Sequence, residues 1–308
     1  MNEEHLIFLI SQPRSGSSMF QQLLVQHDEI CSVPEPWMML SLLTAILPNQ
    51  DNAGFNRKYA QINFNSFLNK YVLRDVFLDH VKQTALALYS KANTKTYFLD
   101  KTPRYYHVIE DLRQIFPKAK FLFLVRNPIA VFSSILSYNF HGNIQAMLRA
   151  PDRQDDLLLA PKIILEQFHK YPKQSLFLRY EELVLKPELV GQKVIEFLNL
   201  KDRMPLKYEI SDEFRNTMFV DKKSIHLHNK PVDSYLDAWK IKITTHEQKN
   251  ALIDYLNKID DQYLSTFNYE RKVLIEDVNK IKVKAGVKSR IKISISWLKK
   301  YMIKDLKS

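Results

Sequence analysis

Hydrophobic residues gather in four short, nearly uninterrupted runs that are separated by polar turns and by longer stretches with helical spacing. The runs lie at residues 6–10, 97–99, 119–125 and 175–178. An uninterrupted apolar run of strand length is typical of a parallel strand that is buried on both faces of its sheet. We therefore expect four parallel strands, with the run at 6–10 in the centre of the sheet.

Between these runs, apolar positions recur at helical spacing, which predicts helices. The clearest such patterns lie at 19–25, 103–116, 129–138, 161–170, 188–198 and 245–256. Most of 36–89 is also helical in pattern, around a polar loop at 49–56. Residues 139–160 lack periodicity and predict a loop or short helices that cover a site, and 212–239 has little regular pattern. Strands that alternate with helices indicate an α/β fold with a central parallel β-sheet flanked by helices.

Composition places the chain among globular proteins with one principal domain. The sequence has 308 residues, of which 45% are hydrophobic and 26% charged, and this is enough to bury one large core. The single cysteine, Cys31, excludes an intramolecular disulfide and fits a reducing compartment, so we expect a cytoplasmic protein. The short apolar stretch near the N-terminus has no basic residues before it, and we expect neither a signal peptide nor a transmembrane helix.

The net charge of +11 is concentrated near the C-terminus, where Lys and Arg outnumber Asp and Glu after Glu270. We therefore divide the chain into a domain at 1–270 and a basic tail at 271–308. The stretch 297–303 within the tail has an amphipathic pattern, and two interpretations stay open: peripheral contact with an anionic membrane surface, or a helix packed on the domain. Because no nucleic-acid-binding motif accompanies the charge, we expect no nucleic-acid partner.

The polar turn after the first strand has the composition of an anion-binding loop. It reads Pro13-Arg14-Ser15-Gly16-Ser17-Ser18, and ligands of parallel sheets collect where a strand ends and a helix begins. The glycine permits close backbone approach, the serines add hydroxyl groups, and the amides of the following helix point at a bound anion. A guanidinium in this loop can form paired hydrogen bonds with the oxygens of a sulfate. A serine-capped turn without a ligand is the alternative for this segment alone.

The same loop argues against a nucleoside triphosphate site. The P-loop of nucleotide triphosphatases and kinases requires Gly-Lys-Ser or Gly-Lys-Thr. No lysine precedes Ser17 or Ser18 here.

A second candidate anion site follows the apolar run at 119–125. Arg126 stands directly after this run, and Ser134 follows about two helical turns later. A buried strand rarely ends in an arginine without an anionic partner. We therefore expect Arg126 and Ser134 to hold an anion, with a structural salt bridge as the alternative.

Together these two segments resemble the PAPS-dependent sulfotransferase family, and the resemblance extends over residues 5–240. In that family the first loop holds the 5'-phosphosulfate of 3'-phosphoadenosine-5'-phosphosulfate (PAPS), and the second holds its 3'-phosphate. The loop Pro-Arg-Ser-Gly-Ser-Ser is similar to that of the carbohydrate and tyrosylprotein branches. The resemblance implies a P-loop-like sulfotransferase fold at 1–270, PAPS as donor and 3',5'-ADP as product, and it assigns Arg14, Ser15, Gly16, Ser17, Ser18, Arg126 and Ser134 to the donor.

Two later segments add to the resemblance. Arg179-Tyr180-Glu181-Glu182 is similar to the segment in which a family tyrosine, here Tyr180, lies near the nucleotide. The run His228-Asn229-Lys230-Pro231 is similar to a late basic segment that closes on the donor, and this makes Lys230 a candidate donor-binding residue.

Sulfuryl transfer requires positive charge near the oxygen that leaves with the nucleotide. Arg14 is one candidate, and Lys101 in Asp100-Lys101-Thr102-Pro103 matches the lysine of the corresponding family motif. The acceptor hydroxyl also needs a base. Cytosolic family members have a histidine two residues after that lysine, whereas this chain has Pro103.

The resemblance gives the role of base to Glu35, in Pro34-Glu35-Pro36. Its position is similar to that of the catalytic glutamate in the tyrosylprotein branch. His107 is the alternative base.

The sequence therefore predicts in-line transfer of a sulfuryl group from PAPS to a hydroxyl of a carbohydrate, tyrosyl or small-molecule acceptor. No His-Glu-x-x-His motif or cysteine set is present, so we expect no metal. The alternatives are a kinase-like phosphotransferase and a non-catalytic nucleotide-binding protein with the same fold. The acceptor and the oligomeric state stay open.

Overall fold

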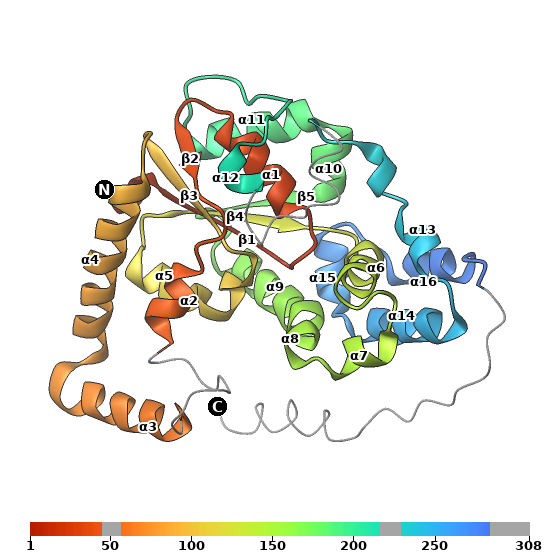
Figure 1. Cartoon of the computed structure of the whole chain (residues 1–308), viewed down its shortest axis with the longest axis horizontal. Helices are drawn as coiled ribbons and strands as arrows, with labels where there is room; N and C mark the ends of the chain where they lie inside the picture. Colours follow the sequence, from red (N-terminus) through yellow and green to blue (C-terminus); the bar gives the residue numbers. More distant parts are fainter. Residues whose placement is uncertain (45–56, 216–228, 284–308) are drawn as a thin grey trace.

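A five-stranded parallel sheet runs through the centre of the computed structural model, which describes residues 1–44, 57–215 and 229–283 (Figure 1). The strands are β1 (Leu6–Ser11), β2 (Ile30–Ser32), β3 (Tyr97–Lys101), β4 (Lys120–Val125) and β5 (Ser175–Arg179). Their spatial order is β2-β3-β1-β4-β5. All four pairs of neighbours are parallel, so all five strands end at the same edge of the sheet.

β1 is the central strand, as the sequence predicts, and every one of its residues is buried. Leu6, Phe8 and Ile10 belong to one hydrophobic core. Ile7 and Leu9 belong to a second core on the other face. This alternation explains the uninterrupted apolar run, because both faces of the strand are covered.

Helices cover both faces of the sheet (Figure 1). One face is covered by α1 (Ser17–Val25), α10 (Tyr180–Leu185) and α11 (Pro187–Leu198). The other face carries α2 (Met38–Leu43), α4 (Arg74–Ala92), α5 (Ile109–Ile115), α6 (Pro128–Asn139), α9 (Ala160–Lys170), α14 (His246–Lys258), α15 (Asp261–Thr266) and α16 (Arg271–Asn279). The fold is therefore the predicted α/β architecture.

Shorter helices and connectors complete the described chain. The α-helices among them are α3 (Arg57–Phe67), α7 (Ile144–Arg149), α8 (Pro151–Gln154), α12 (Asp212–Arg215) and α13 (Trp239–Lys242). The 3-10 helices are η1 (Glu3–His5), η3 (Pro103–Val108) and η5 (Asp233–Tyr235), and the π-helices are η2 (Leu68–Val72) and η4 (Asp155–Leu159).

Three elements differ from the sequence-based expectation. The edge strand β2 was not predicted, because its three residues include Cys31 and Ser32 and form no apolar run. The single helix expected at 103–116 is divided into η3 and α5. α10 follows β5 directly and was not predicted. Residues 139–160, in contrast, do form the expected short helices, α7, α8 and η4.

The first part of the predicted tail forms α16, whose Leu274 and Val278 are buried in the core beside α14. The amphipathic stretch at 297–303, the loop at 49–56 and His228 lie outside the described residues. Among the described helices, none has both the length and the apolar character needed to cross a bilayer.

Candidate active site

Each of the five strands delivers a predicted site residue to the same edge of the sheet. Lys101 ends β3, Arg126 follows β4, and Tyr180 follows β5. Arg14 lies in the turn between β1 and α1, and Glu35 follows β2. Because the strands are parallel and adjacent, residues from widely separated parts of the sequence meet here.

The loop between β1 and α1 has a backbone conformation that requires glycine at its end. Gly16 is the N-cap of α1 with φ of 96°, in the left-handed region that side chains disfavour. A Cβ atom at Gly16 would lie 2.4 Å from Cδ2 of Tyr180, so the tyrosine ring leaves no room for one. Arg14 also has a positive φ, 73°. The loop thus brings backbone amides of the first turn of α1 to the sheet edge, where an anion can accept their hydrogen bonds.

Serine hydroxyls line the same loop. Ser15 is fully buried, and its Oγ has no hydrogen-bond partner among the described residues. Ser17 is also buried, at the start of α1. Ser18 Oγ accepts a hydrogen bond from Lys101 Nζ at 3.2 Å. A buried hydroxyl without a partner is rare in proteins and is satisfied when a ligand oxygen binds beside it.

Arg14 and Arg126, predicted to hold two different anionic groups, are in direct contact. Arg126 Nη1 donates a hydrogen bond to the Arg14 carbonyl at 3.2 Å. Arg14 Nε donates to Ser134 Oγ at 3.2 Å, which brings the predicted serine of α6 to the same place. The guanidinium of Arg14 also lies over the ring of Tyr138, 4.0 Å from its centroid.

Arg126 is a buried cation whose surroundings suit an added anion. Its guanidinium stacks on Tyr180 at 4.0 Å, and Nη2 donates to the Tyr235 carbonyl at 3.0 Å. Burial is the main cause that lowers its pKa, and the positive charge of Arg14 adds to this, against the opposing effects of Tyr180 and Glu181. Nε has no hydrogen-bond partner, and no carboxylate of the described chain lies within ion-pair distance. An unpaired buried charge is costly, so a bound phosphate would stabilise this group.

Glu35 and Lys101 form an ion pair beside the loop. Lys101 Nζ lies 2.5 Å from Glu35 Oε1, and the lysine side chain is 1% exposed. The other carboxylate oxygen, Oε2, accepts a hydrogen bond from Trp37 Nε1 at 3.1 Å. Since Lys101 also contacts Ser18, it joins Glu35, which follows β2, to the loop between β1 and α1.

A buried carboxyl lies directly before Lys101. Asp100 accepts hydrogen bonds from Tyr89 and Tyr105 at 2.6 and 2.8 Å and from Thr102 Oγ1 at 2.9 Å. Burial raises its pKa to about 6, although the three hydroxyl groups oppose this and Glu35 adds to it. This cluster fixes the end of β3 from which Lys101 projects.

The segment 139–160 reaches the start of the turn between β1 and α1 through Asp156. Its backbone carbonyl accepts a hydrogen bond from Gln12 Nε2 at 3.0 Å. Its carboxylate binds Arg104 through Nε at 3.0 Å and Nη2 at 2.7 Å. Arg104 in turn lies 5.9 Å from the ring centroid of Trp37, so this segment is connected to the residues around Glu35.

Two of the predicted residues are exposed at the surface. Lys230 is exposed in the segment before η5. His107 is exposed on η3, and its ring lies 4.2 Å from that of Tyr106. Trp37, Tyr138 and Tyr235, which contact the predicted charged groups, were missed. The two tyrosines lie far along the chain from their arginines, and no local pattern reveals the hydrogen bond from Trp37 to the nearby Glu35.

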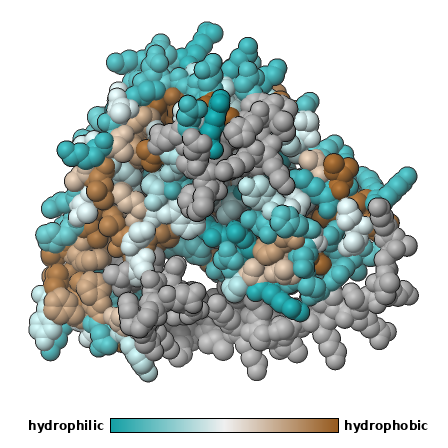
Figure 2. All heavy atoms as spheres, viewed as in Figure 1, coloured by the Kyte–Doolittle hydropathy of each residue, from teal (hydrophilic) through white to brown (hydrophobic). Residues whose placement is uncertain are grey.

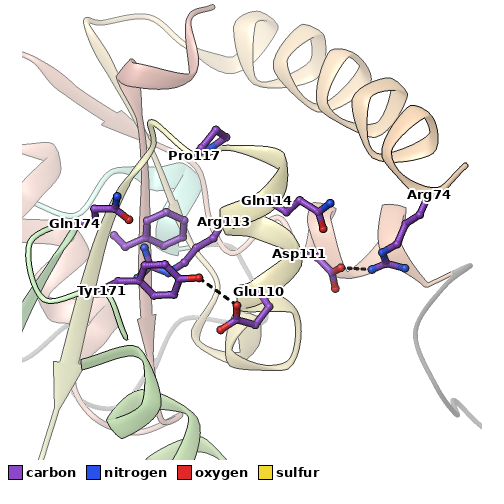
Figure 3. Close-up of a pocket in the computed structure, with 9 residues that line it drawn as sticks. Arg74, Glu110, Asp111, Arg113, Gln114, Pro117, Tyr171 and Gln174 are labelled. Carbon is purple, nitrogen blue, oxygen red and sulfur yellow. Dashed lines mark hydrogen bonds and ion pairs between the residues drawn. The ribbon is translucent and has the colours of Figure 1, made fainter. Parts of the chain in front are cut away.

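A cavity of about 510 Å³ lies at the opposite edge of the sheet and is separate from this constellation (Figure 3). Its lining includes Phe121 at the start of β4 and Gln174 just before β5. Arg113 is held between the rings of Phe121 and Tyr171, at 4.2 and 4.0 Å. It also donates to Gln167 Oε1 and Ser175 Oγ, so it ties α5 to α9 and β5. Within the described residues, no group of three or more His, Cys, Asp or Glu side chains is arranged to hold a metal.

Comparison with known proteins identifies relatives of this chain. The nodulation protein NoeE of Sinorhizobium fredii is 27% identical over 271 residues, which are 80% of this chain and 62% of NoeE. This chain therefore spans less than two thirds of that relative's length. A putative protein-tyrosine sulfotransferase of Caenorhabditis briggsae is 24% identical over 204 residues, 65% of this chain and 67% of that protein.

Solved structures share the fold. The sulfotransferase domain from the curacin biosynthetic pathway has a TM-score of 0.58 at 20% identity, covering 86% of this chain and 97% of that one. The sulfotransferase domain of the Synechococcus PCC 7002 olefin synthase has a TM-score of 0.57 at 18% identity, covering 86% and 94%. The sequence profile of the Sulfotransferase family matches residues 7–203. This range includes the ends of all five strands and the candidate residues that follow them, Arg14, Glu35, Lys101, Arg126 and Tyr180. The chain therefore belongs to the sulfotransferase family.

Proposed function

We propose that this chain transfers a sulfuryl group from PAPS to a hydroxyl-bearing acceptor. The observation that carries the proposal is the juxtaposition, at one sheet edge, of two contacting arginines with a carboxylate–lysine pair. The arginines supply positive charge for a doubly anionic donor. The pair beside them supplies a base and a cation for the transfer.

In this proposal the donor occupies the loop of β1 and the end of β4. The buried cation Arg126, with Ser134, takes the 3'-phosphate. The amides of the first turn of α1 and the hydroxyl groups of Ser15 to Ser18 take the 5'-phosphosulfate, with Arg14. Three observations support this fit: the partnerless buried Nε of Arg126, the partnerless buried Oγ of Ser15, and the absence of room for a Cβ at Gly16.

Glu35 is the proposed base and Lys101 the proposed electrostatic stabiliser. During transfer, the acceptor oxygen bonds to sulfur while the bond from sulfur to the bridging phosphate oxygen breaks, and 3',5'-ADP leaves. Glu35 accepts the hydroxyl proton. Lys101 stabilises the negative charge that develops on the bridging oxygen. Trp37, which donates to Oε2 of Glu35, orients the carboxylate.

The acceptor in this proposal is a carbohydrate, tyrosyl or small-molecule hydroxyl. Two relatives are named as protein-tyrosine sulfotransferases, one of them putative. The position of Glu35 near the loop that contains Arg14 also favours a sugar or tyrosyl acceptor. Peptides that contain tyrosine and oligosaccharides are therefore the first acceptors to test.

The deciding experiment combines donor binding with an acceptor screen. Calorimetric titration of 3',5'-ADP should show binding that Arg126→Ala weakens. Radiolabelled PAPS should label at least one acceptor class, with or without a chelator, and Glu35→Gln should slow this labelling at least about 100-fold. Transfer of phosphate from ATP with magnesium would instead indicate a kinase-like enzyme, and binding of 3',5'-ADP without labelling of any acceptor would indicate a non-catalytic protein.

A further inference from the structure

Large apolar side chains are exposed where α3 and η2 lead into α4. Ile62 is 52% exposed, Phe67 50%, Tyr71 66% and Leu73 63%. Figure 2 shows hydrophobic residues gathered over α4 and the corner where it meets α3. Single exposed hydrophobic residues are ordinary, whereas several in one short segment mark an interaction surface. We call Ile62, Phe67, Lys70, Tyr71 and Leu73 the corner surface.

Packing of the domain does not account for these side chains. The inward positions of the same segment are filled by other residues: Leu68 is 3% exposed, and Phe64 packs edge-on against Phe77 with ring centroids 5.5 Å apart. Leu73, moreover, has φ of 70°, a conformation that is costly for a leucine. The turn therefore holds an exposed leucine in a strained backbone conformation, although other residues of the segment already fill the core positions.

The charge of this segment is one-sided. From Arg57 to Arg74 the sequence contains four basic residues and no acidic residue. Lys70 has no carboxylate partner among the described residues, and its Nζ lies 4.9 Å from the centroid of the Tyr71 ring. Asp75, the first acidic residue after the segment, accepts a hydrogen bond from Gln114. Basic side chains interleaved with aromatic and aliphatic ones are typical of elements that lie in the interface of an anionic bilayer.

A second copy of this chain suits the surface less well. Lysine is depleted in the buried centres of protein–protein interfaces, and two copies facing each other would bring like charges together. Lipid headgroups supply the opposite charge, and the acyl boundary accepts the apolar groups.

We propose that the corner surface docks the protein onto anionic lipid bilayers, with Phe67, Tyr71 and Leu73 entering the interface and Lys70 binding headgroups. This proposal is independent of the proposed catalytic function, because the corner surface contains none of the candidate site residues. It concerns a different part of the chain from the basic C-terminal tail.

The test is sedimentation of the full-length protein with vesicles of phosphatidylcholine alone or mixed with phosphatidylglycerol. The triple variant Phe67→Ser/Tyr71→Ser/Leu73→Ser should bind the mixed vesicles about tenfold or more weakly, since it loses three apolar groups that enter the interface. The matched control Leu185→Ser/Leu189→Ser/Ile241→Ser removes apolar residues that are 60%, 48% and 81% exposed elsewhere, and it should bind like the wild type.

A second variant changes the charge of the corner surface at one residue and leaves its apolar side chains in place. Lys70→Glu should also weaken binding to the mixed vesicles, and high salt should reduce the difference from the wild type. This variant keeps the apolar residues. It therefore tests the proposal even if circular dichroism shows that the triple variant is unfolded. Because every variant keeps residues 271–308, binding through the tail contributes equally to all of them.

Two results would overturn the proposal. One is binding of the triple and Lys70→Glu variants that equals that of the wild type. The other is a wild type that does not bind vesicles but is a dimer by light scattering, while the triple variant is a monomer, which would assign the corner surface to a second copy of this chain.

Discussion

Arg126 donates a hydrogen bond from Nη1 to the backbone carbonyl of Arg14 at 3.2 Å. Arg14 lies after β1 and Arg126 after β4, two neighbouring strands of the sheet. The contact makes the conformation of the first loop depend on a side chain of the second. The two arginines therefore lie together at one edge of the sheet, which is the arrangement that the proposed donor site needs.

Arg126→Ala should weaken donor binding without changing the chemistry. Loss of hydrogen bonds to a charged group costs about 1.5–3 kcal/mol, so the KM for PAPS and the Kd for 3',5'-ADP should rise roughly 10- to 100-fold, with a smaller effect on kcat. Steady-state kinetics and calorimetry measure both. Lys118→Ala removes a cation that is 64% exposed before β4 and should leave both constants unchanged. Equal loss in the two variants would mean that net charge, and not this site, governs donor affinity.

Glu35→Gln should lower kcat and leave donor affinity nearly unchanged. General base catalysis contributes about 100- to 10,000-fold in rate, and glutamine keeps the shape of the side chain that Trp37 and Lys101 contact. Single-turnover assays with saturating PAPS and acceptor measure the effect. His107→Ala, which removes the alternative base, should retain wild-type turnover. The opposite ranking of these two variants would transfer the role of base to His107.

Gly16→Ala should destabilise the fold as well as the donor site. The new Cβ would lie 2.4 Å from the Tyr180 ring, in a backbone with φ of 96°. Left-handed strain and overpacking together cost about 2–4 kcal/mol, which urea denaturation can measure. Gly16→Ala should cost less in a Tyr180→Ala background than in the wild type, since the ring that the new Cβ meets is then absent. An equal cost in the two backgrounds would show that the backbone conformation alone causes the loss.

Asp100 should make stability depend on pH between about 4 and 6. Burial raises the pKa of Asp100 in the folded state to about 6, above the usual value for an aspartate, so the folded state holds this proton more tightly than the unfolded state. The contribution of Asp100 to stability is therefore present at low pH and is lost as pH rises through this window. The free energy of unfolding of Asp100→Asn minus that of the wild type should increase by about 2 kcal/mol from pH 4 to pH 7.

Urea denaturation of both proteins across this range tests the prediction, because other groups titrate alike in the two and cancel in the difference. A difference that stays constant with pH would show that Asp100 is ionised throughout.

The sheet and the two arginine-bearing turns could be predicted from the sequence because their signals are local. β1 and β4 are long apolar runs, and Arg14 and Arg126 stand at the ends of these runs. β2 could not be predicted, because its three residues gain their strand structure from pairing with β3. The division of 103–116 has a similar cause: Tyr105 and Tyr106 are both buried and donate to Asp100 and Asp156, contacts that no local pattern reveals.

The side chains that contact the charged groups could not be predicted from the sequence either. Trp37 appears in the sequence beside Glu35, but its hydrogen bond to the carboxylate depends on a left-handed backbone at Trp37, with φ of 52°. Tyr138 and Tyr235 contact the arginines across long separations in the chain. The roles assigned to all these residues stay predictions for the experiments above.

The strand that precedes Glu35 lies at the margin of the sheet. β2 has one neighbour and pairs with it over three residues, whereas β1 and β4 are flanked on both sides. In the proposed function, the base would therefore stand beyond the most weakly paired strand of the sheet, whereas the two arginines that would hold the donor follow strands with a neighbour on each side.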